Sequence, residues 1–234
     1  MKIIILIIAD DTKEYYVQMQ NNWRKYMNTH PDIKSYFIKF SLNIIDDVII
    51  DELDKTIWIK GMESYIPGIL DKTIKSMKFL VENNFDFDYI FRTNLSSVVH
   101  LSKLYNYLMK NTVEYGGPLG KIKLKKEHRK YIKAIDNFDS SNRVFPSGTG
   151  ILLGKNVVEF LLKEKIDYNI IDDLSIGFTL SKYYKLFPLQ RYILINYNSK
   201  IIENDDLFLY RCKSSIEHLE TINLMNKVIE IIYK

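Results

Sequence analysis

The stretch that decides the fold is "FDYIFRTNLSSVVHLSKL", residues 87–104. An apolar run at 89–91 leads into a polar tip at 92–97, and a helical pattern follows. Open α/β sheets are built from such strand-to-helix units and bind their ligands at the carboxyl ends of the strands. The tip contains no acid and no glycine, so this candidate site would rely on amide and hydroxyl groups.

Strand and helix patterns alternate on both sides of this unit. Strands are predicted at 2–9, 35–40, 56–61 and 88–94, and helices at 13–28, 68–84 and 101–111. This alternation is typical of βαβ units and predicts an α/β fold with a mixed, mostly parallel sheet flanked by helices. Later elements are predicted as a strand before Asn156, helices from Asn156 and Asp172, a strand at 191–197, an edge strand or extended tail at 207–215, and a closing helix.

Composition indicates an ordinary globular protein. Hydrophobic residues make up 47% and charged residues 26% of the 234 residues, and no repeat or linker divides them, so we expect one domain spanning 1–234. The single cysteine, Cys212, excludes an internal disulfide and favours a cytoplasmic location. The apolar run at 3–9 is too short to span a bilayer and is predicted to be a buried strand. No transmembrane segment is expected.

The formal net charge is +4, and basic residues concentrate at 120–133. This segment is either a solvated surface or a patch that attracts phosphates or an anionic acceptor. It matches no nucleic-acid-binding motif, so we expect no nucleic-acid partner.

Two further motifs carry polar groups to element ends. Gly148 and Gly150 flank Thr149 directly before an apolar strand, where glycines permit either a tight turn or the close approach of a ligand. Asp172 and Asp173 begin a predicted helix, where carboxylates stabilise the helix dipole or act as a general base.

The order of these motifs resembles the GT-A-fold glycosyltransferases of the fringe and β-1,3-galactosyltransferase type. The matching segments are "FRTNLSS", "YGGP", "SGTGILLG" at 147–154, and "DDLSIG" at 172–177. The resemblance covers roughly residues 1–195, with motif-level identity at 85–180. The chain is also similar to short glycosyltransferases encoded by large DNA viruses. The family's fold implies a Rossmann-like nucleotide-binding half, 1–110, and an acceptor half, 111–234.

The resemblance also implies roles for individual residues. Asp173, with Asp172 as the alternative, would deprotonate the acceptor hydroxyl in a single inverting displacement. The nucleotide would lie over the carboxyl ends of the first strands, the diphosphate near residues 94–96, and residues 148–150 against the donor sugar or acceptor. The residues implied to bind the donor are Ala9, Asp10, Asp11, Arg92, Asn94, Ser96, Ser147, Gly148, Thr149, Gly150 and Arg211.

The chain departs from the family at the acidic motif, which holds a divalent cation on the donor diphosphate. Asn94-Leu95-Ser96 stand in its place. One interpretation is that Mn²⁺ or Mg²⁺ is still bound, by Asn94, Ser96 and His218 or by the acids at 10–11. His218 would otherwise be a plain surface residue of the closing helix.

A second interpretation is a metal-independent enzyme that neutralises the diphosphate with Arg92, Arg211, Lys213 or the basic segment. The pair Arg211 and Lys213 would otherwise protect a strand edge. A third is a catalytically silent module that binds nucleotide sugars or glycans. The sequence thus predicts a glycosyltransferase using a nucleotide-diphosphate sugar, UDP-linked, with a glycan or glycoprotein hydroxyl as acceptor, and keeps the silent module as the alternative.

Overall fold

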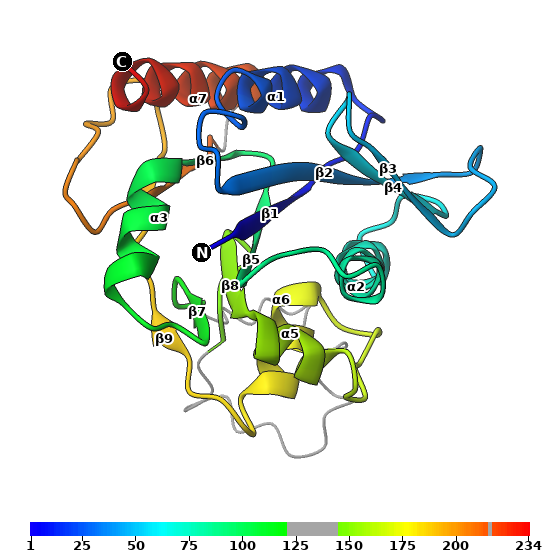
Figure 1. Ribbon diagram of the computed structural model, residues 1–234. Helices are drawn as coiled ribbons and strands as arrows, with labels where there is room; N and C mark the ends of the chain where they lie inside the picture. Colours follow the sequence, from blue (N-terminus) through cyan, green and yellow to red (C-terminus); the bar gives the residue numbers. More distant parts are fainter. Residues whose placement is uncertain (121–144, 215–216) are drawn as a thin grey trace, which may run out of the picture.

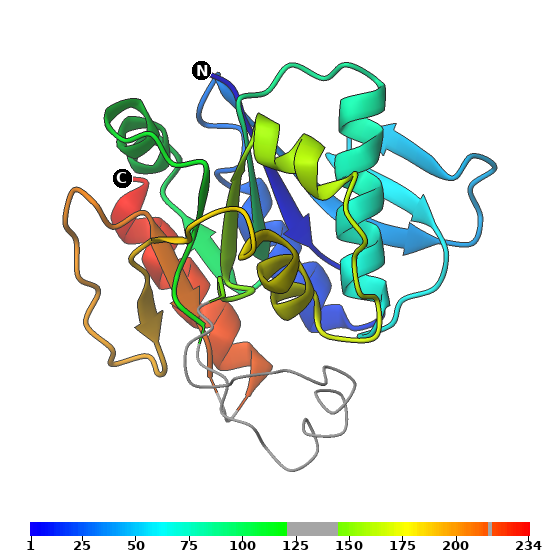
Figure 2. The same cartoon turned by 90° about the horizontal axis from the view of Figure 1, so that it is seen from below.

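The computed structural model describes residues 1–120, 145–214 and 217–234, so the basic residues of the 120–133 segment lie outside the described part. Helices cover both faces of a central sheet (Figures 1 and 2). The strands of this sheet are β1 (Ile3–Ile8), β2 (Ile33–Ser41), β3 (Val48–Asp51), β4 (Thr56–Lys60), β5 (Tyr89–Asn94), β7 (Tyr115–Gly117), β8 (Gly150–Gly154) and β9 (Phe187–Pro188).

The eight strands lie in the order β3-β4-β2-β1-β5-β8-β7-β9. Strands β4, β2, β1 and β5 run parallel, whereas β8 is antiparallel to both β5 and β7. The predicted fold class is therefore confirmed. The sequence reading did not include β3, which forms an antiparallel pair with β4.

Strand β1 lies near the middle of the sheet and sends alternate side chains into two cores. Ile3, Ile5 and Ile7 pack with the helices α1 (Glu14–Arg24), α3 (Leu101–Lys110) and α7 (His218–Ile232). Ile4 and Leu6 pack with α2 (Gly68–Glu82), α5 (Lys155–Leu161) and α6 (Asp172–Leu180) on the other face. Burial on both faces explains why β1 is an uninterrupted apolar run.

A smaller sheet holds three strands in the order β10 (Tyr192–Leu194), β11 (Leu209–Cys212) and β6 (Ser97–Val99). The expectation of an edge strand or tail at 207–215 is wrong, because β11 is the middle strand and pairs on both sides. The polar tip also does not turn directly into a helix, since β6 precedes α3. Pairing β6 with β11 brings Arg211 opposite Ser97, beside the end of β5.

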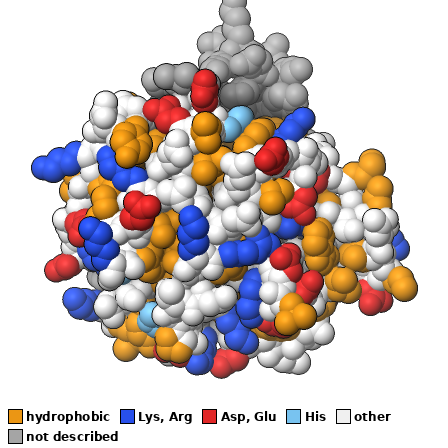
Figure 3. Space-filling model, turned by 90° about the horizontal axis from the view of Figure 1, so that it is seen from above, with side chains coloured by type: hydrophobic (Ala, Val, Ile, Leu, Met, Phe, Trp, Pro, Cys, Tyr) orange, Lys and Arg blue, Asp and Glu red, His pale blue; other side chains and the backbone are white. Residues whose placement is uncertain are grey.

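The closing helix α7 packs on α1 of the same chain. Asn22 Nδ2 donates to the carbonyl oxygen of Ile222 at 3.3 Å, and Lys25 Nζ donates to Asn226 Oδ1 at 2.7 Å. Acidic and basic side chains both spread over the face formed by these helices (Figure 3). In the described part of the chain, no helix is long and apolar enough to cross a membrane.

Candidate active site

A cavity of about 620 Å³ lies at the carboxyl ends of β1 and β5, next to the amino end of α7. It brings together residues that are up to 213 positions apart in the sequence, from Ile8 to Thr221. Six of the predicted site residues line it: Ala9, Asp10, Asn94, Ser96, Arg211 and His218. The converging ends of parallel strands therefore form the concave surface that the fold rule predicts.

Arg211, from β11, contacts the side chains of the polar tip. Its Nη1 donates hydrogen bonds to Asn94 Oδ1 and Ser96 Oγ. Asn94 Oδ1 also accepts from Ser97 Oγ at 2.9 Å, and Asn94 Nδ2 donates to the carbonyl oxygen of Gly148 at 3.1 Å. The amide and hydroxyl groups of the polar tip therefore bind a guanidinium group.

The charge of Arg211 has no carboxylate partner among the described residues. Burial lowers the pKa of Arg211 to about 10, and the neighbouring cations Arg191 and Arg92 add to this effect. The group stays cationic at neutral pH. A half-enclosed cation with neutral hydrogen-bond partners is suited to bind an anion from the cavity.

The oxygens that the metal-bound interpretation would use at this site accept hydrogen bonds from other groups of the protein. The side-chain oxygens of Asn94 and Ser96 accept from Arg211. Asp10 Oδ1 accepts from the backbone nitrogen of Thr12 at 2.9 Å and from its hydroxyl at 2.6 Å. Among the residues described, no group of three or more His, Cys, Asp or Glu side chains could hold a metal ion.

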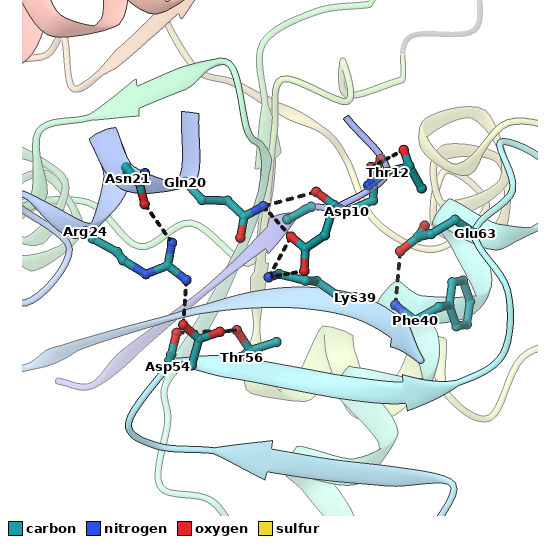
Figure 4. Close-up of polar contacts among 12 residues, drawn as sticks. Asp10, Thr12, Gln20, Asn21, Arg24, Lys39, Phe40, Asp54, Thr56 and Glu63 are labelled. Carbon is teal, nitrogen blue, oxygen red and sulfur yellow. Dashed lines mark hydrogen bonds and ion pairs between the residues drawn. The ribbon is translucent and has the colours of Figure 1, made fainter. Parts of the chain in front are cut away.

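The two remaining predicted metal ligands have other partners. Lys39 Nζ lies 3.0 Å from both carboxylate oxygens of Asp11, and Gln20 Nε2 donates to one of them at 2.8 Å. Figure 4 shows the Gln20 and Lys39 side chains pointing toward each other. Asp11 does not line the cavity. The His218 ring stacks on the Tyr15 ring with centroids 3.7 Å apart.

A second cluster adjoins the cavity through the Gly148 carbonyl. Arg92 donates to this carbonyl and to Asp172 Oδ2. The backbone nitrogen of Gly148 donates to Asp173 Oδ2 at 2.9 Å, and that of Leu174 donates to Asp173 Oδ1 at 2.9 Å. Asp172 is therefore paired with a guanidinium, whereas Asp173 is held by backbone amides at the start of α6.

Asp173 has the electrostatic properties of a general base. Burial, with the adjacent charge of Asp172, raises the pKa of Asp173 to about 6. The hydrogen bonds from Gly148 and Leu174 and the charge of Arg92 oppose this rise. A carboxylate with a pKa close to neutral is ionised at pH 7 and still has useful proton affinity.

Close packing explains the two glycines of the "SGTG" segment. The φ angle of Gly148 is not positive, so backbone conformation does not require a glycine there. A β-carbon on Gly148 would, however, lie 3.1 Å from Arg92 Nη1 and 3.3 Å from Asp173 Oδ2. A β-carbon on Gly150 would lie 2.7 Å from the Phe91 ring. Gly150 is buried in β8 and does not line the cavity. The structure therefore does not place Gly150 next to the predicted donor position.

Ser147 and Thr149 bind a basic residue that the sequence reading did not include. Arg191 Nη1 donates to Ser147 Oγ at 2.5 Å and to Thr149 Oγ1 at 2.6 Å. Neither side chain lines the cavity. Arg191 follows a short strand in a region without a motif, so no sequence signal marked it.

Sequence reasoning also missed a buried ion pair on the opposite wall. Lys72 Nζ donates to the carbonyl oxygen of Ala9 and to Glu63 Oε2, each at 2.7 Å. Burial lowers the pKa of Lys72 although the charge of Glu63 opposes it. Lys72 lies one turn before Ser76 on α2, and both side chains are buried, although neither is apolar.

The chain matches no protein-family model and no curated protein. It superposes on a glycosyltransferase involved in the glycosylation of the major capsid of PBCV-1 with a TM-score of 0.54 and 9% identity, over 97% of this chain and 100% of that one. An inositol-1-phosphate CTP transferase from T. maritima gives a TM-score of 0.50 at 10% identity, over 98% and 97% of the two chains. The galactosyltransferase LgtC, solved with donor and acceptor sugar analogs, gives 0.49 at 12% identity, over 98% and 95%.

The first two superpositions establish the class of fold. The chain has the GT-A-like α/β fold that the sequence resemblance implied, and it covers the whole length of the PBCV-1 protein. A glycosyltransferase and a CTP transferase both have this fold, so fold similarity does not by itself choose the reaction. The reaction has to be inferred from the residues of the site.

Proposed function

We propose that the chain is a glycosyltransferase that transfers a sugar from a UDP-linked donor to a hydroxyl group of a glycan or glycoprotein acceptor. The observation that carries this proposal is the Arg211 guanidinium, bound by Asn94 and Ser96 at the wall of a 620 Å³ cavity. The motif order shared with the fringe type and the superposition on a viral glycosyltransferase support the same class.

The donor's diphosphate binds next to Arg211. Lys13 and Lys213 line the same cavity as Arg211, and Lys72 lines it as well but is paired with Glu63. Guanidinium groups bind phosphate oxygens through paired, charge-assisted hydrogen bonds. In the reaction these groups stabilise the negative charge that develops on the leaving diphosphate.

Asp173 acts as the general base in a single displacement. Its carboxylate takes the proton of the acceptor hydroxyl while the hydroxyl oxygen forms a bond to the anomeric carbon of the donor sugar. The bond between that carbon and the diphosphate oxygen breaks, and the electron pair leaves with the nucleoside diphosphate. Attack opposite to the leaving group inverts the anomeric configuration.

The reaction proceeds without a divalent cation. The oxygens at positions 94 and 96 accept hydrogen bonds from Arg211, and the carboxylates nearest to the first strand bind Thr12 and Lys39. Arg211 therefore supplies the positive charge that a metal ion supplies in the family's acidic motif. Mg²⁺ or Mn²⁺ would have to displace the Arg211 guanidinium from the oxygens of Asn94 and Ser96.

Titration calorimetry with UDP and a panel of UDP-linked sugars tests the proposal, with EDTA, Mg²⁺ or Mn²⁺ in matched buffers. We expect UDP to bind with the same dissociation constant in all three. Binding that requires a cation would contradict metal independence but not the enzyme class. No binding of any nucleotide would overturn the proposal.

Nuclear magnetic resonance of the reaction mixture distinguishes an active glycosyltransferase from a module that binds the donor without reaction. The donor that binds is incubated with a panel of glycan acceptors, and release of UDP is followed together with the anomeric signal. A β-linked product from an α-linked donor is expected. Tight binding of the donor with no release of UDP to any acceptor or to water would identify a binding module.

A further inference from the structure

The loop between β4 and α2 lies at the mouth of the cavity and is fixed on both sides of Tyr65. On one side, Glu63 Oε1 accepts from the backbone nitrogen of Phe40 at 3.0 Å (Figure 4), and Glu63 Oε2 accepts from Lys72 at 2.7 Å. The Lys72 side chain is only 2% exposed. A buried ammonium group with this geometry fixes the loop to the sheet and to α2 at once.

The other side of Tyr65 is fixed by the start of α2. Ser64 Oγ accepts from the backbone nitrogen of Gly68 at 3.0 Å. Ser64 Oγ would lie 2.5 Å from a β-carbon on Gly68, so the approach is close and leaves no room for a larger residue. The backbone that carries Tyr65 is therefore rigid, although its side chain points outwards.

Tyr65 combines exposure with a place in the site. Its side chain is 69% exposed and yet lines the cavity that contains Asn94 and Arg211. Partial burial and the charges of Asp172 and Asp173 raise the pKa of the Tyr65 hydroxyl, which places the ring within electrostatic reach of the acid pair. Tyr65 thus shares the cavity with Arg211 and is close enough to the acid pair to interact with it electrostatically.

The other tyrosines of the cavity are already packed against aromatic rings. The His218 ring covers Tyr15, and Tyr16 packs edge-on against Tyr15 with centroids 4.4 Å apart. Within the described part of the chain, Tyr65 has neither an aromatic neighbour nor a hydrogen-bond partner. A rigidly mounted aromatic face remains open at the mouth of the cavity.

We propose that Tyr65 is the platform on which the sugar ring of the nucleotide-linked donor packs. This inference rests on the proposed function, because it assumes a nucleotide sugar. With the diphosphate at Arg211 and the base at Asp173, the transferred pyranose has to lie within reach of both groups, and Tyr65 lines the cavity with Arg211 and interacts electrostatically with the acid pair. The ring offers its apolar face to the C–H groups of the sugar at a low cost in conformational entropy.

Glu63 and Lys72 are the positioning residues of this platform. They touch neither phosphate nor base in the proposed arrangement and act by fixing the loop that carries Tyr65. Preorganising a contact before the ligand arrives reduces the entropy lost on binding.

The test compares UDP with a UDP-linked sugar on the same variants by titration calorimetry. The panel of UDP sugars first identifies one that wild-type protein binds more tightly than UDP. Tyr65→Ala is expected to weaken that sugar nucleotide by about fivefold while UDP affinity stays unchanged. Tyr65→Phe keeps the ring and should keep the difference. Tyr183→Ala is the matched control, because Tyr183 is 60% exposed and lies outside the cavity.

The outcomes separate the platform from the proposed function. Unchanged UDP affinity in Tyr65→Ala shows that the variant is folded and that the nucleotide site is intact. The platform alone is overturned if Tyr65→Ala still binds the UDP-linked sugar more tightly than UDP by the wild-type factor. It is also overturned if wild-type protein binds UDP but binds no UDP-linked sugar more tightly than UDP. Failure of wild-type protein to bind any nucleotide overturns both.

Discussion

Buried cations lie on both sides of the candidate site, but their partners differ. At the ends of β1 and β2, Lys39 contacts Asp11 at 3.0 Å and Lys72 contacts Glu63 at 2.7 Å, and both lysine side chains are almost fully buried. At the ends of β5 and β8, Arg211 and Arg191 donate only to amide and hydroxyl oxygens.

The difference separates structural charge from charge that is available to a ligand. An ion pair inside the protein cancels its own field, so Lys39 and Lys72 stabilise the positions of loops and strands. A buried guanidinium with neutral partners keeps its field and gains most when an anion arrives. We therefore expect substitutions on the first side to change folding stability and those on the second side to change ligand binding.

The largest effect is expected from Asp173→Asn. An amide cannot accept the acceptor proton, so kcat should fall by about 10²- to 10⁴-fold while donor affinity stays within about twofold. Release of UDP from the bound donor measures this. In wild-type protein, kcat/KM should fall as the pH drops below about 6, because protonation of Asp173 removes the base. Asp205→Asn, at an exposed position, is the control, and equal losses in both variants would contradict the assignment.

The next largest effect is expected from Lys72→Met. It leaves Glu63 partly buried without its partner, so the free energy of unfolding should fall by about 3 to 5 kcal/mol in urea titrations. The double variant Lys72→Met with Glu63→Leu removes both charges and should recover most of the loss. If the double variant is no more stable than the single one, the ion pair is not the cause.

Arg211→Met should weaken UDP binding by about 10- to 100-fold, which corresponds to the loss of a charged hydrogen bond. Its free energy of unfolding should change far less than that of Lys72→Met, because no counter-charge is left behind. Arg24→Met removes a guanidinium that pairs with Asp54 at 2.6 Å outside the cavity, and should leave UDP affinity unchanged. A UDP affinity in Arg211→Met equal to wild type would remove the basis of the phosphate site.

Asn94→Asp makes the second side resemble the first and should have the smallest effect. The new carboxylate would pair with Arg211, so UDP affinity should fall by about tenfold in EDTA and folding stability should not decrease. Calorimetry and urea titration measure the two quantities. Asn21→Asp is the control, because Asn21 is exposed on α1. Tighter UDP binding by Asn94→Asp without a cation would contradict an anion site at Arg211.

Local patterns predicted the strands β1, β2, β4, β5 and β8 of the main sheet, though not β3, and the strand ends that carry the site. Strand β5 and its polar tip were visible because an apolar run followed by polar residues marks the carboxyl end of a buried strand. Asp172 and Asp173 were placed at the start of α6 for a similarly local reason. Both predictions depend on residues that are neighbours in the sequence.

Contacts between distant residues could not be predicted in this way. Arg211 is 117 positions from Asn94 and 115 from Ser96, and it reaches both only because β11 is the middle strand of the small sheet and not an edge. The ion pair between Lys72 and Glu63 depends on how the loop before α2 folds back on β2.

The sequence by itself determined the alternation of strands and helices, the apolar core strand β1 and the presence of neutral residues at 94–96, because these are properties of short segments. Tertiary structure alone decided which cation those neutral residues bind, which acids are already paired, and that Tyr65 opens onto the cavity. Charge compensation depends on distances through space, and those are fixed only when the whole sheet and its loops have packed.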